Sequence, residues 1–139
     1  MNRTIKFRGK RIDNGQWVYG DLVQCDHDIL ILPINTGWTH HKVIPETVGQ
    51  FTGLLDRNGK EIYEGDILHE RVARCIVDKR IVKFCYGSFI AESTYNQGAQ
   101  CYGEPHEKFQ SLKYFAVNDI KIEVIGNIHD NPELLSSKQ

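Results

Sequence analysis

The sequence of 139 residues contains no long hydrophobic run. Its longest apolar stretch, Ile29–Leu32, is far too short to cross a bilayer, because a membrane-spanning helix needs about 20 consecutive apolar residues. The basic residues between Arg3 and Arg11 are not followed by the apolar segment of a secretory signal. We therefore expect a protein without membrane association, located in the cytoplasm.

The sequence also lacks an excess of charge of either sign. Seventeen Lys and Arg against eighteen Asp and Glu leave a formal net charge of −1, which excludes a global field that attracts nucleic acid or membranes. No low-complexity tract indicates disorder. A chain of this size buries enough surface to fold without a disulfide or metal. We predict one domain, residues 1–139, with a mobile loop at 96–108 and a frayed tail at 135–139.

Cysteine is scarce and irregularly spaced. The four thiols form no C-x-x-C pair, and the six histidines add no spacing typical of a zinc site. In a cytoplasmic chain such thiols stay reduced. The sequence therefore predicts no metal and no cofactor. The cysteines are Cys25, Cys75, Cys85 and Cys101.

Short alternating runs separated by turn residues fill most of the sequence. The segment Thr4–Leu32 is typical of a hairpin followed by a third strand, with a type I′ turn at Asn14-Gly15. A second turn, Asp56-Arg57-Asn58-Gly59, joins two further strands. We also expect strands within Ile29–Ile34, Val43–Leu55, Lys60–Tyr63, Ile67-Leu68, Ile76–Phe84, Ser88–Ala91, Tyr114–Val117 and Ile120–Ile128, and a helical turn after Asn131-Pro132.

This pattern predicts an all-β fold, a sandwich or a small barrel, with the barrel favoured. Apolar residues at strand positions form the predicted core. These are Ile5, Phe7, Val18, Leu22, Ile31, Val48, Phe51, Ile62, Ile67, Val82, Phe84, Ile122, Val124 and Ile128.

Five blocks, in order along the chain, resemble the YopX family of phage and prophage proteins. The resemblance implies a small SH3-like barrel with extra strands and a short C-terminal helical turn. It also implies a phage or prophage origin in a bacterial host. It implies no reaction and transfers no catalytic residue. The blocks are residues 5–10, 17–22, 47–54, 56–67 and 124–135.

An enzyme is the least favoured of three functional hypotheses. Carboxylates gather near the second turn, and His129-Asp130 offers a neighbouring base, as general acid–base catalysis requires. However, turns also favour acidic residues beside glycine. We therefore predict no catalytic residue and no enzyme activity. The carboxylates are Asp56, Glu61, Glu64 and Asp66.

A nucleic-acid-binding protein is the second hypothesis. Strand alternation places Lys6, Arg8 and Lys10 on the face opposite Ile5 and Phe7, where they could contact a row of phosphates. A later basic stretch adds Arg80 and Lys83, and aromatic residues could stack on bases. The alternative explanation is a solvated strand face whose lysines protect a sheet edge. The aromatic residues are Trp17, Tyr19, Trp38 and Tyr86.

A non-catalytic binding module is the favoured hypothesis. A small β-domain can bind a partner through an exposed edge or an aromatic groove, and this requires the fewest particular residues. The expected partner is a protein, with nucleic acid as the alternative and a homo-oligomer left open. No membrane partner is expected. The segment from His69 to Lys113 shows the least family resemblance, so a function particular to this protein is most expected there.

Overall fold

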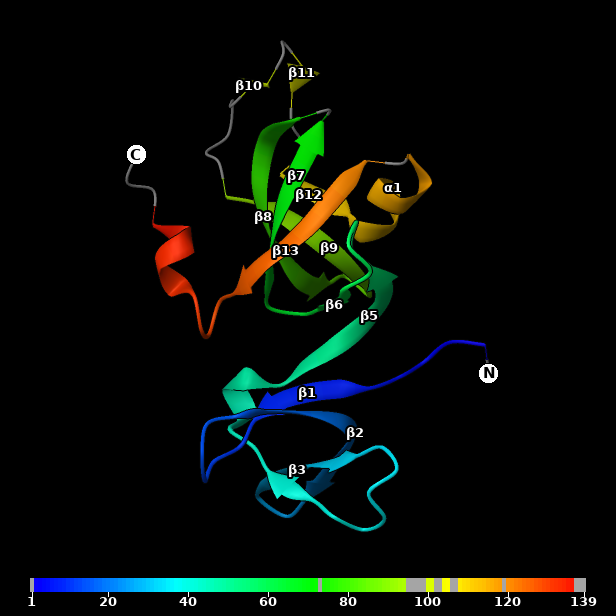
Figure 1. Cartoon of the computed structure of the whole chain (residues 1–139), viewed down its shortest axis with the longest axis vertical. Coiled ribbons are helices and arrows are strands. Elements are labelled where there is room, and N and C mark those ends of the chain that lie inside the picture. Colours follow the sequence, from blue (N-terminus) through cyan, green and yellow to red (C-terminus); the bar gives the residue numbers. More distant parts are fainter. Residues whose placement is uncertain are drawn as a thin grey trace. The chain divides into compact units, whose positions relative to one another are not determined.

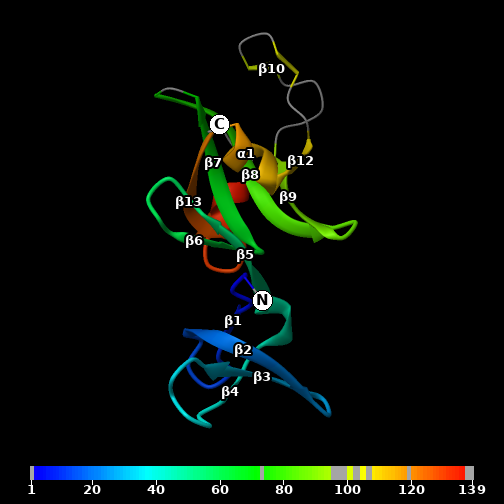
Figure 2. The same ribbon diagram turned by 90° about the vertical axis from the view of Figure 1, so that its right-hand side faces the viewer.

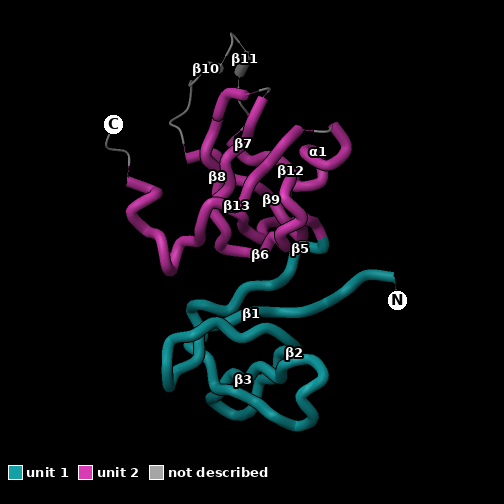
Figure 3. Tube along the Cα trace, in the orientation of Figure 1, with its two compact units in different colours: residues 1–53 teal, residues 54–139 magenta. Residues whose placement is uncertain are grey.

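The computed structural model describes residues 2–72, 74–94, 100–101, 104–105, 108–118 and 120–136. By contacts within the chain it divides into two compact units, residues 1–53 (unit 1) and 54–139 (unit 2), coloured separately in Figure 3. The single-domain prediction stays a prediction. The predicted mobile loop lies mostly outside the described residues, as do the last three residues of the predicted tail.

Unit 1 is an antiparallel sheet with the strand order β4-β3-β2-β1-β5. One face packs around Val18, Ile31 and Val43, which are almost completely buried. A β-carbon at Gly20 would lie 2.0 Å from the Leu32 carbonyl oxygen, so only glycine fits there. The elements are β1 (Phe7–Lys10), β2 (Trp17–Cys25), β3 (Asp28–Pro33), β4 (His41–Lys42), the 3-10 turn η1 (Pro45–Thr47) and β5 (Gly49–Leu55), whose last two residues belong to unit 2.

Unit 2 is built on a five-stranded sheet with the order β12-β9-β8-β7-β13, drawn from two sides in Figures 1 and 2. The pairings of this sheet are antiparallel. The elements are β6 (Glu61–Tyr63), β7 (Asp66–Val72), β8 (Cys75–Cys85), β9 (Ser88–Ser93), β10 (Gln100–Cys101), β11 (Glu104–Pro105), β12 (Phe109–Ser111), α1 (Leu112–Val117), β13 (Lys121–Asn127) and the 3-10 turn η2 (Pro132–Leu135).

Helix α1 covers one face of the unit 2 sheet. Its Leu112 and Phe115 are 1% exposed and pack with residues of β6, β7, β8, β9 and β13. On the other face, the Lys79 ammonium donates a hydrogen bond of 2.6 Å to the Leu134 carbonyl and so fastens η2 to β8. The core residues are Ile62, Leu68, Val82, Ala91, Leu112, Phe115 and Ile122.

The fold is mainly β, as predicted. Within the residues that the structure describes, both large sheets have two different end strands, so neither closes on itself. The barrel part of the prediction is therefore not confirmed. The helical turn predicted after Asn131-Pro132 is confirmed as η2. No helix in the described part of the chain is long and apolar enough to span a membrane.

Two local predictions were wrong. Tyr114–Val117 was predicted as a strand but lies in α1, because Leu112 and Phe115, three residues apart on one helical face, both bury against the sheet. The hairpin of β1 and β2 is confirmed, but its turn is not type I′, since Gly15 has a positive φ and Asn14 does not. Both residues of Tyr86-Gly87 have positive φ, as a type I′ turn requires, and they join β8 to β9.

The predicted core is partly confirmed. Ile5 and Phe84 are 36% and 55% exposed; Ile5 precedes β1, and Phe84 is the last residue but one of β8. The prediction missed Leu68, Leu112 and Phe115, which are almost completely buried. The predicted core residues that are buried are Val18, Ile31, Phe51, Ile62, Ile67, Val82 and Ile122, and those partly buried are Phe7, Leu22, Val48, Val124 and Ile128.

Candidate functional site

A pocket of about 180 Å³ opens on the surface of unit 2. Its floor consists of Phe115 and Ile122, which belong to the hydrophobic core. Leu55, which is 57% exposed, and Ala116 line the pocket nearer the solvent. Leu54 and Ile120 complete an apolar lining. The pocket therefore joins the core of unit 2 to the solvent.

One wall of the pocket is the turn that begins at Asp56. The backbone amides of Asn58 and Lys60 each donate a hydrogen bond of 2.8 Å to Asp56 Oδ1, and the amide of Val124 donates one of 2.9 Å to Oδ2. The Arg57 amide donates to the Ile122 carbonyl at 2.9 Å. These bonds fasten the turn to β13, so this wall is fixed before any ligand arrives.

The charges around this pocket are mainly positive. Asp56 is 7% exposed, and both its carboxylate oxygens accept backbone amides, which compensate its charge inside the protein. Arg57 and Lys121 also line the pocket, and both residues are exposed. The described lining therefore combines an apolar floor with one buried acidic residue and two exposed basic residues.

The volume of the pocket limits what it can hold. An apolar cavity of about 150 Å³ is enough for a benzene ring, whereas sites for drug-sized ligands and cofactors occupy about 300–1,000 Å³. At about 180 Å³ the unit 2 pocket fits one apolar side chain and is too small for a nucleotide.

Unit 1 has a pocket of about 260 Å³ whose lining residues are mostly of polar types. Its walls are Ile12, Asp13 and the segment His40–Lys42. The Arg11 guanidinium forms an ion pair of 2.6 Å with Asp13, and this hydrogen bond lowers the pKa of the Asp13 carboxyl. The larger pocket thus lacks the apolar floor that the unit 2 pocket takes from its core.

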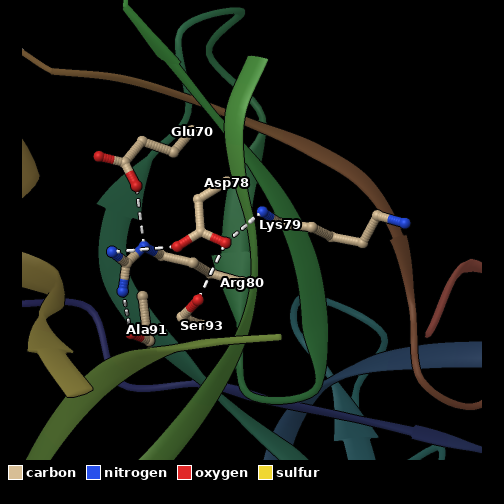
Figure 4. Close-up of polar contacts among 6 residues, drawn as sticks. All are labelled: Glu70, Asp78, Lys79, Arg80, Ala91 and Ser93. Carbon is tan, nitrogen blue, oxygen red and sulfur yellow. Dashed lines mark hydrogen bonds and ion pairs between the residues drawn. The ribbon is translucent and has the colours of Figure 1, made fainter. Parts of the chain in front are cut away.

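A buried charge network lies in the core face of the unit 2 sheet (Figure 4). Arg80 Nε donates to Glu70 Oε2 at 2.9 Å, and Arg80 Nη2 pairs with Asp78 Oδ2 at 3.2 Å. The Ser93 hydroxyl donates to Asp78 Oδ1 at 3.0 Å. Arg80 is 2% exposed and lies over the Phe115 ring, 5.3 Å from its centroid. The network fixes the sheet beneath α1 and offers nothing to a solvent ligand.

The basic residues predicted from the sequence lie in different settings. Arg8 is 6% exposed, and its guanidinium lies 4.6 Å from the Trp17 ring centroid. The ammonium groups of Lys6 and Lys10, which are partly buried, lie over the rings of Phe51 and Trp17 at 5.1 and 5.5 Å. In unit 2, Arg80 is buried in the charge network, and Lys83 is ion-paired with Glu92. The two arginines are thus not part of a solvated basic face.

Comparisons with known proteins agree with this architecture. The family described as "YopX protein" matches residues 6–136. This chain belongs to the YopX family. Among solved structures, it resembles the crystal structure of protein EF1440 from Enterococcus faecalis with a TM-score of 0.54 and 24% identity, covering 97% of this chain and 100% of that one. At this identity the likeness shows the fold alone. No curated protein matches the chain.

Two of the four carboxylates near the second turn, Asp56 and Asp66, accept backbone amides in this YopX-family chain. Asp66 is 1% exposed and accepts the Tyr63 amide at 2.8 Å, as Asp56 accepts its three amides. The amides of His129 and Asp130 donate to Asn127 Oδ1 at 3.0 and 2.9 Å. The contacts of Asp56 and Asp66 give these two carboxylates a structural role.

The thiols are dispersed over the YopX-family chain. Cys25 and Cys75 are exposed, Cys85 is partly buried, and none of the three forms a disulfide. The side chain of Cys101 lies outside the described residues. Nowhere in the described part of the chain do three or more His, Cys, Asp or Glu side chains gather as metal ligands would. The predicted reduced, metal-free state stays a prediction.

The pKa of His69, in unit 2, is displaced. Burial lowers the pKa of its imidazole below the usual 6.5, and the charges of Lys79 and Arg71 lower it further, against the opposing effect of Glu123. His69 lies on β7, opposite Lys79 of β8 and Glu123 of β13. It is a pH-sensitive element of the sheet outside the pocket.

The sequence did not reveal the unit 2 pocket of this YopX-family protein. Asp56 and Arg57 were identified as turn residues, but nothing placed them beside Phe115 and Ala116. Phe115 and Ala116 belong to α1, and this segment was predicted as a strand, so its place beside the turn could not be inferred.

Proposed function

We propose that this YopX-family protein is a non-catalytic binding module, encoded by a phage or prophage and acting in the cytoplasm of the bacterial host. The resemblance of the sequence to phage and prophage proteins supports this setting. The module recognises a protein partner and catalyses no reaction.

The unit 2 pocket is the observation that carries this proposal. Its apolar floor is continuous with the core, and its wall is held by the hydrogen bonds of Asp56. Binding energy in protein interfaces concentrates where an anchor side chain fills such a pocket, and a preformed wall reduces the entropy cost of binding. The size of the pocket favours a protein side chain over a cofactor.

The absence of catalysis is part of the proposal. General acid–base chemistry needs titratable groups that converge in a cleft. Asp56 is the acid in the lining of the unit 2 pocket, and its oxygens already accept three backbone amides. A carboxylate held in this way is suited to fixing a turn and poorly suited to exchanging protons with a substrate.

Quantitative affinity capture from a prophage-carrying host tests the proposal. Ala116→Trp fills the pocket with an indole ring. The matched control is Val117→Trp, which adds the same ring at a neighbouring exposed position of α1 outside the lining. We expect at least one protein to be retained by the wild type and Val117→Trp and lost from Ala116→Trp. The proposal fails if no captured protein is lost from Ala116→Trp while circular dichroism shows that the wild type and both variants are folded.

Nucleic-acid binding is the second candidate, favoured by one observation in unit 1. Lys10, in β1, and Lys6, just before β1, lie near the aromatic rings of Trp17 and Phe51, a combination used by proteins that bind single strands. Arg8 and Arg80 are left out of this candidate because they are buried.

Fluorescence anisotropy with labelled oligonucleotides at two salt concentrations tests this candidate. Two phosphate contacts predict a log–log salt slope of about −1.4 on single strands and about −1.8 on duplex DNA. Replacing Lys6 and Lys10 by Gln should flatten that slope, while Lys83→Gln should not. Absence of binding at low salt by the folded protein would remove nucleic acid as a candidate.

A further inference from the structure

We infer that protonation of His69 loosens η2 from the unit 2 sheet by repelling the Lys79 ammonium that holds this turn. The inference concerns the face of the sheet opposite α1, which we call the outer face. It goes beyond the proposed function, because it assigns a pH-dependent conformational change to the C-terminal turn and does not involve the pocket.

His69 lies beside Lys79 on the outer face. In the register of the sheet, Lys79 of β8 stands directly opposite His69 of β7. Residues opposite each other in an antiparallel pair project from the same face, with β-carbons about 4.5–5.5 Å apart. Leu68 and Glu70 flank His69 along β7 and belong to the core and the charge network, on the α1 face. The His69 side chain therefore projects from the outer face. Figure 4 shows the Lys79 side chain extending away from the charge network.

Lys79 holds η2 through its ammonium group, which donates a hydrogen bond of 2.6 Å to the carbonyl of the partly buried Leu134. The chain that leads to η2 is fixed separately, because the Ile128 amide donates to the Gly65 carbonyl at 2.9 Å. Loss of the Lys79 bond therefore loosens the turn at Pro132–Leu135 and leaves the strands of the sheet in place.

His69 is flanked by two cations and one carboxylate. Arg71 lies two residues further along β7, and Glu123, opposite His69 on β13, is already ion-paired with Arg71 at 3.0 Å. Burial lowers the pKa of His69, and the charges of Lys79 and Arg71 lower it further, against the effect of Glu123. A proton on His69 therefore adds a third positive charge to this group. Two further charged residues belong to the neighbouring elements, Lys121 of β13, opposite Arg71, and Glu133 of η2.

The repulsion between His69 and Lys79 acts on both groups. Coupling between two equilibria is reciprocal, so protonation of His69 disfavours the held ammonium as much as the held ammonium disfavours protonation. The flexible lysine side chain can rotate into solvent, where its charge is hydrated and screened. The pKa of His69 is therefore higher when η2 is loosened. Release grows as the pH falls from the usual 6.5 through the lower pKa of the held state.

Nuclear magnetic resonance of the ¹³C,¹⁵N-labelled protein tests the inference between about pH 7.5 and about pH 4.5. The ring resonances of His69 report its protonation, and the Leu134 carbonyl carbon and the Leu135 amide report the bond to Lys79. We expect these signals to titrate together, while the amides of Ala91 and Phe115 on the α1 face stay unchanged. The equilibrium between held and loosened η2 should move about two- to fivefold, as a charge pair near the surface allows.

Four variants separate this coupling from a general effect of pH. His69→Gln should abolish the titration of the Leu134 carbonyl, whereas His27→Gln, which removes an exposed imidazole of unit 1, should leave it in place. Lys79→Met removes the repelling charge and should raise the pKa of His69. Lys79→Arg retains a cation that can bind the carbonyl, so it should keep that pKa low.

A Leu134 carbonyl signal that stays constant while His69 titrates would overturn the inference. So would a titration of Leu134 that persists in His69→Gln, because Glu133 would then be its source, or a pKa of His69 that is the same in Lys79→Met and the wild type. Comparison of the His69 and Leu134 signals in the wild type needs no variant, so it decides the question even if a variant does not fold.

Discussion

Unit 1 and unit 2 build their interiors in different ways. Unit 1 packs small and β-branched residues such as Val18 and Val43, and a glycine at position 20 lets the backbone of β2 approach β3. Unit 2 packs bulky side chains, with Phe115 at the centre, and accommodates the buried charges around Arg80. Unit 1 therefore has a small aliphatic core, whereas unit 2 combines bulky side chains with buried charges.

This difference also distinguishes the two pockets. The pocket of unit 1 is larger but takes none of its lining from the core residues Val18, Ile31 and Val43, because Ile12, Asp13 and His40–Lys42 line it. The smaller pocket of unit 2 reaches core residues, since Phe115 of α1 and Ile122 of β13 belong to its lining. Apolar binding therefore depends on access to the core more than on the volume of a surface depression.

The largest expected effect comes from the buried charge network of unit 2. Arg80→Ala leaves the carboxylates of Glu70 and Asp78 buried without their cation, which should lower the free energy of unfolding by about 3–5 kcal/mol. The control is Lys83→Ala on the same strand, whose more exposed ion pair with Glu92 should cost about 0–1 kcal/mol. Equal costs in urea denaturation would contradict the structural role of Arg80.

A smaller effect is expected where the backbones of unit 1 approach each other. Gly20→Ala places a β-carbon 2.0 Å from the Leu32 carbonyl oxygen and should lower stability by about 1–3 kcal/mol or more, as overpacking does. Gly15→Ala is the matched control, because open space surrounds that position and only its positive φ opposes the new side chain. If thermal unfolding finds Gly20→Ala no less stable than Gly15→Ala, the close approach is not required.

A stabilising change is expected at the turn between β8 and β9. Tyr86 has a φ of 51° and is fully exposed, although type I′ turns favour Asn at this position. Tyr86→Asn should raise the free energy of unfolding by about 0.5–1 kcal/mol, because Asn tolerates the left-handed conformation better than Tyr. Alanine also disfavours the left-handed conformation. If Tyr86→Ala raised the free energy of unfolding as much as Tyr86→Asn, this explanation would be refuted.

The smallest expected effect is a pH dependence due to His69. Its folded pKa lies below the ordinary 6.5, so the unfolded chain takes up this proton more readily. His69 therefore favours folding above about pH 6.5, and this contribution is lost as the pH falls through that value towards the folded pKa. Between about pH 7.5 and about pH 5.5, the wild type should lose more stability than His69→Asn in urea titrations. Equal losses would exclude His69 as the cause.

The sequence predicted the features of the fold that depend on neighbouring residues. The hairpin of β1 and β2 follows from local alternation, and the Asp56 turn from residues that favour turns. Helix α1 was missed because it has only six residues and owes its form to the burial of Leu112 and Phe115 against distant strands. A short segment carries too weak a periodicity to indicate this.

The candidate site was hardly predictable for the same reason. Arg80 was assigned to solvent because it stands in a basic stretch, but the register of β7 with β8 brings Glu70 beside it. The unit 2 pocket joins the Asp56 turn to α1 and β13, which lie far apart in sequence. Such long-range pairings determine burial and charge environment, and no local pattern encodes them.

Titration with indole tests most directly whether the unit 2 pocket accepts one apolar group. In ¹⁵N-labelled protein we predict saturable shifts at the amides of Ala116, Ile120 and Ile122, none at His40 or His41 of the unit 1 pocket, and loss of the shifts in Ala116→Trp but not in Val117→Trp. Shifts confined to the unit 1 pocket, or none at Ala116, Ile120 and Ile122, would contradict the claim.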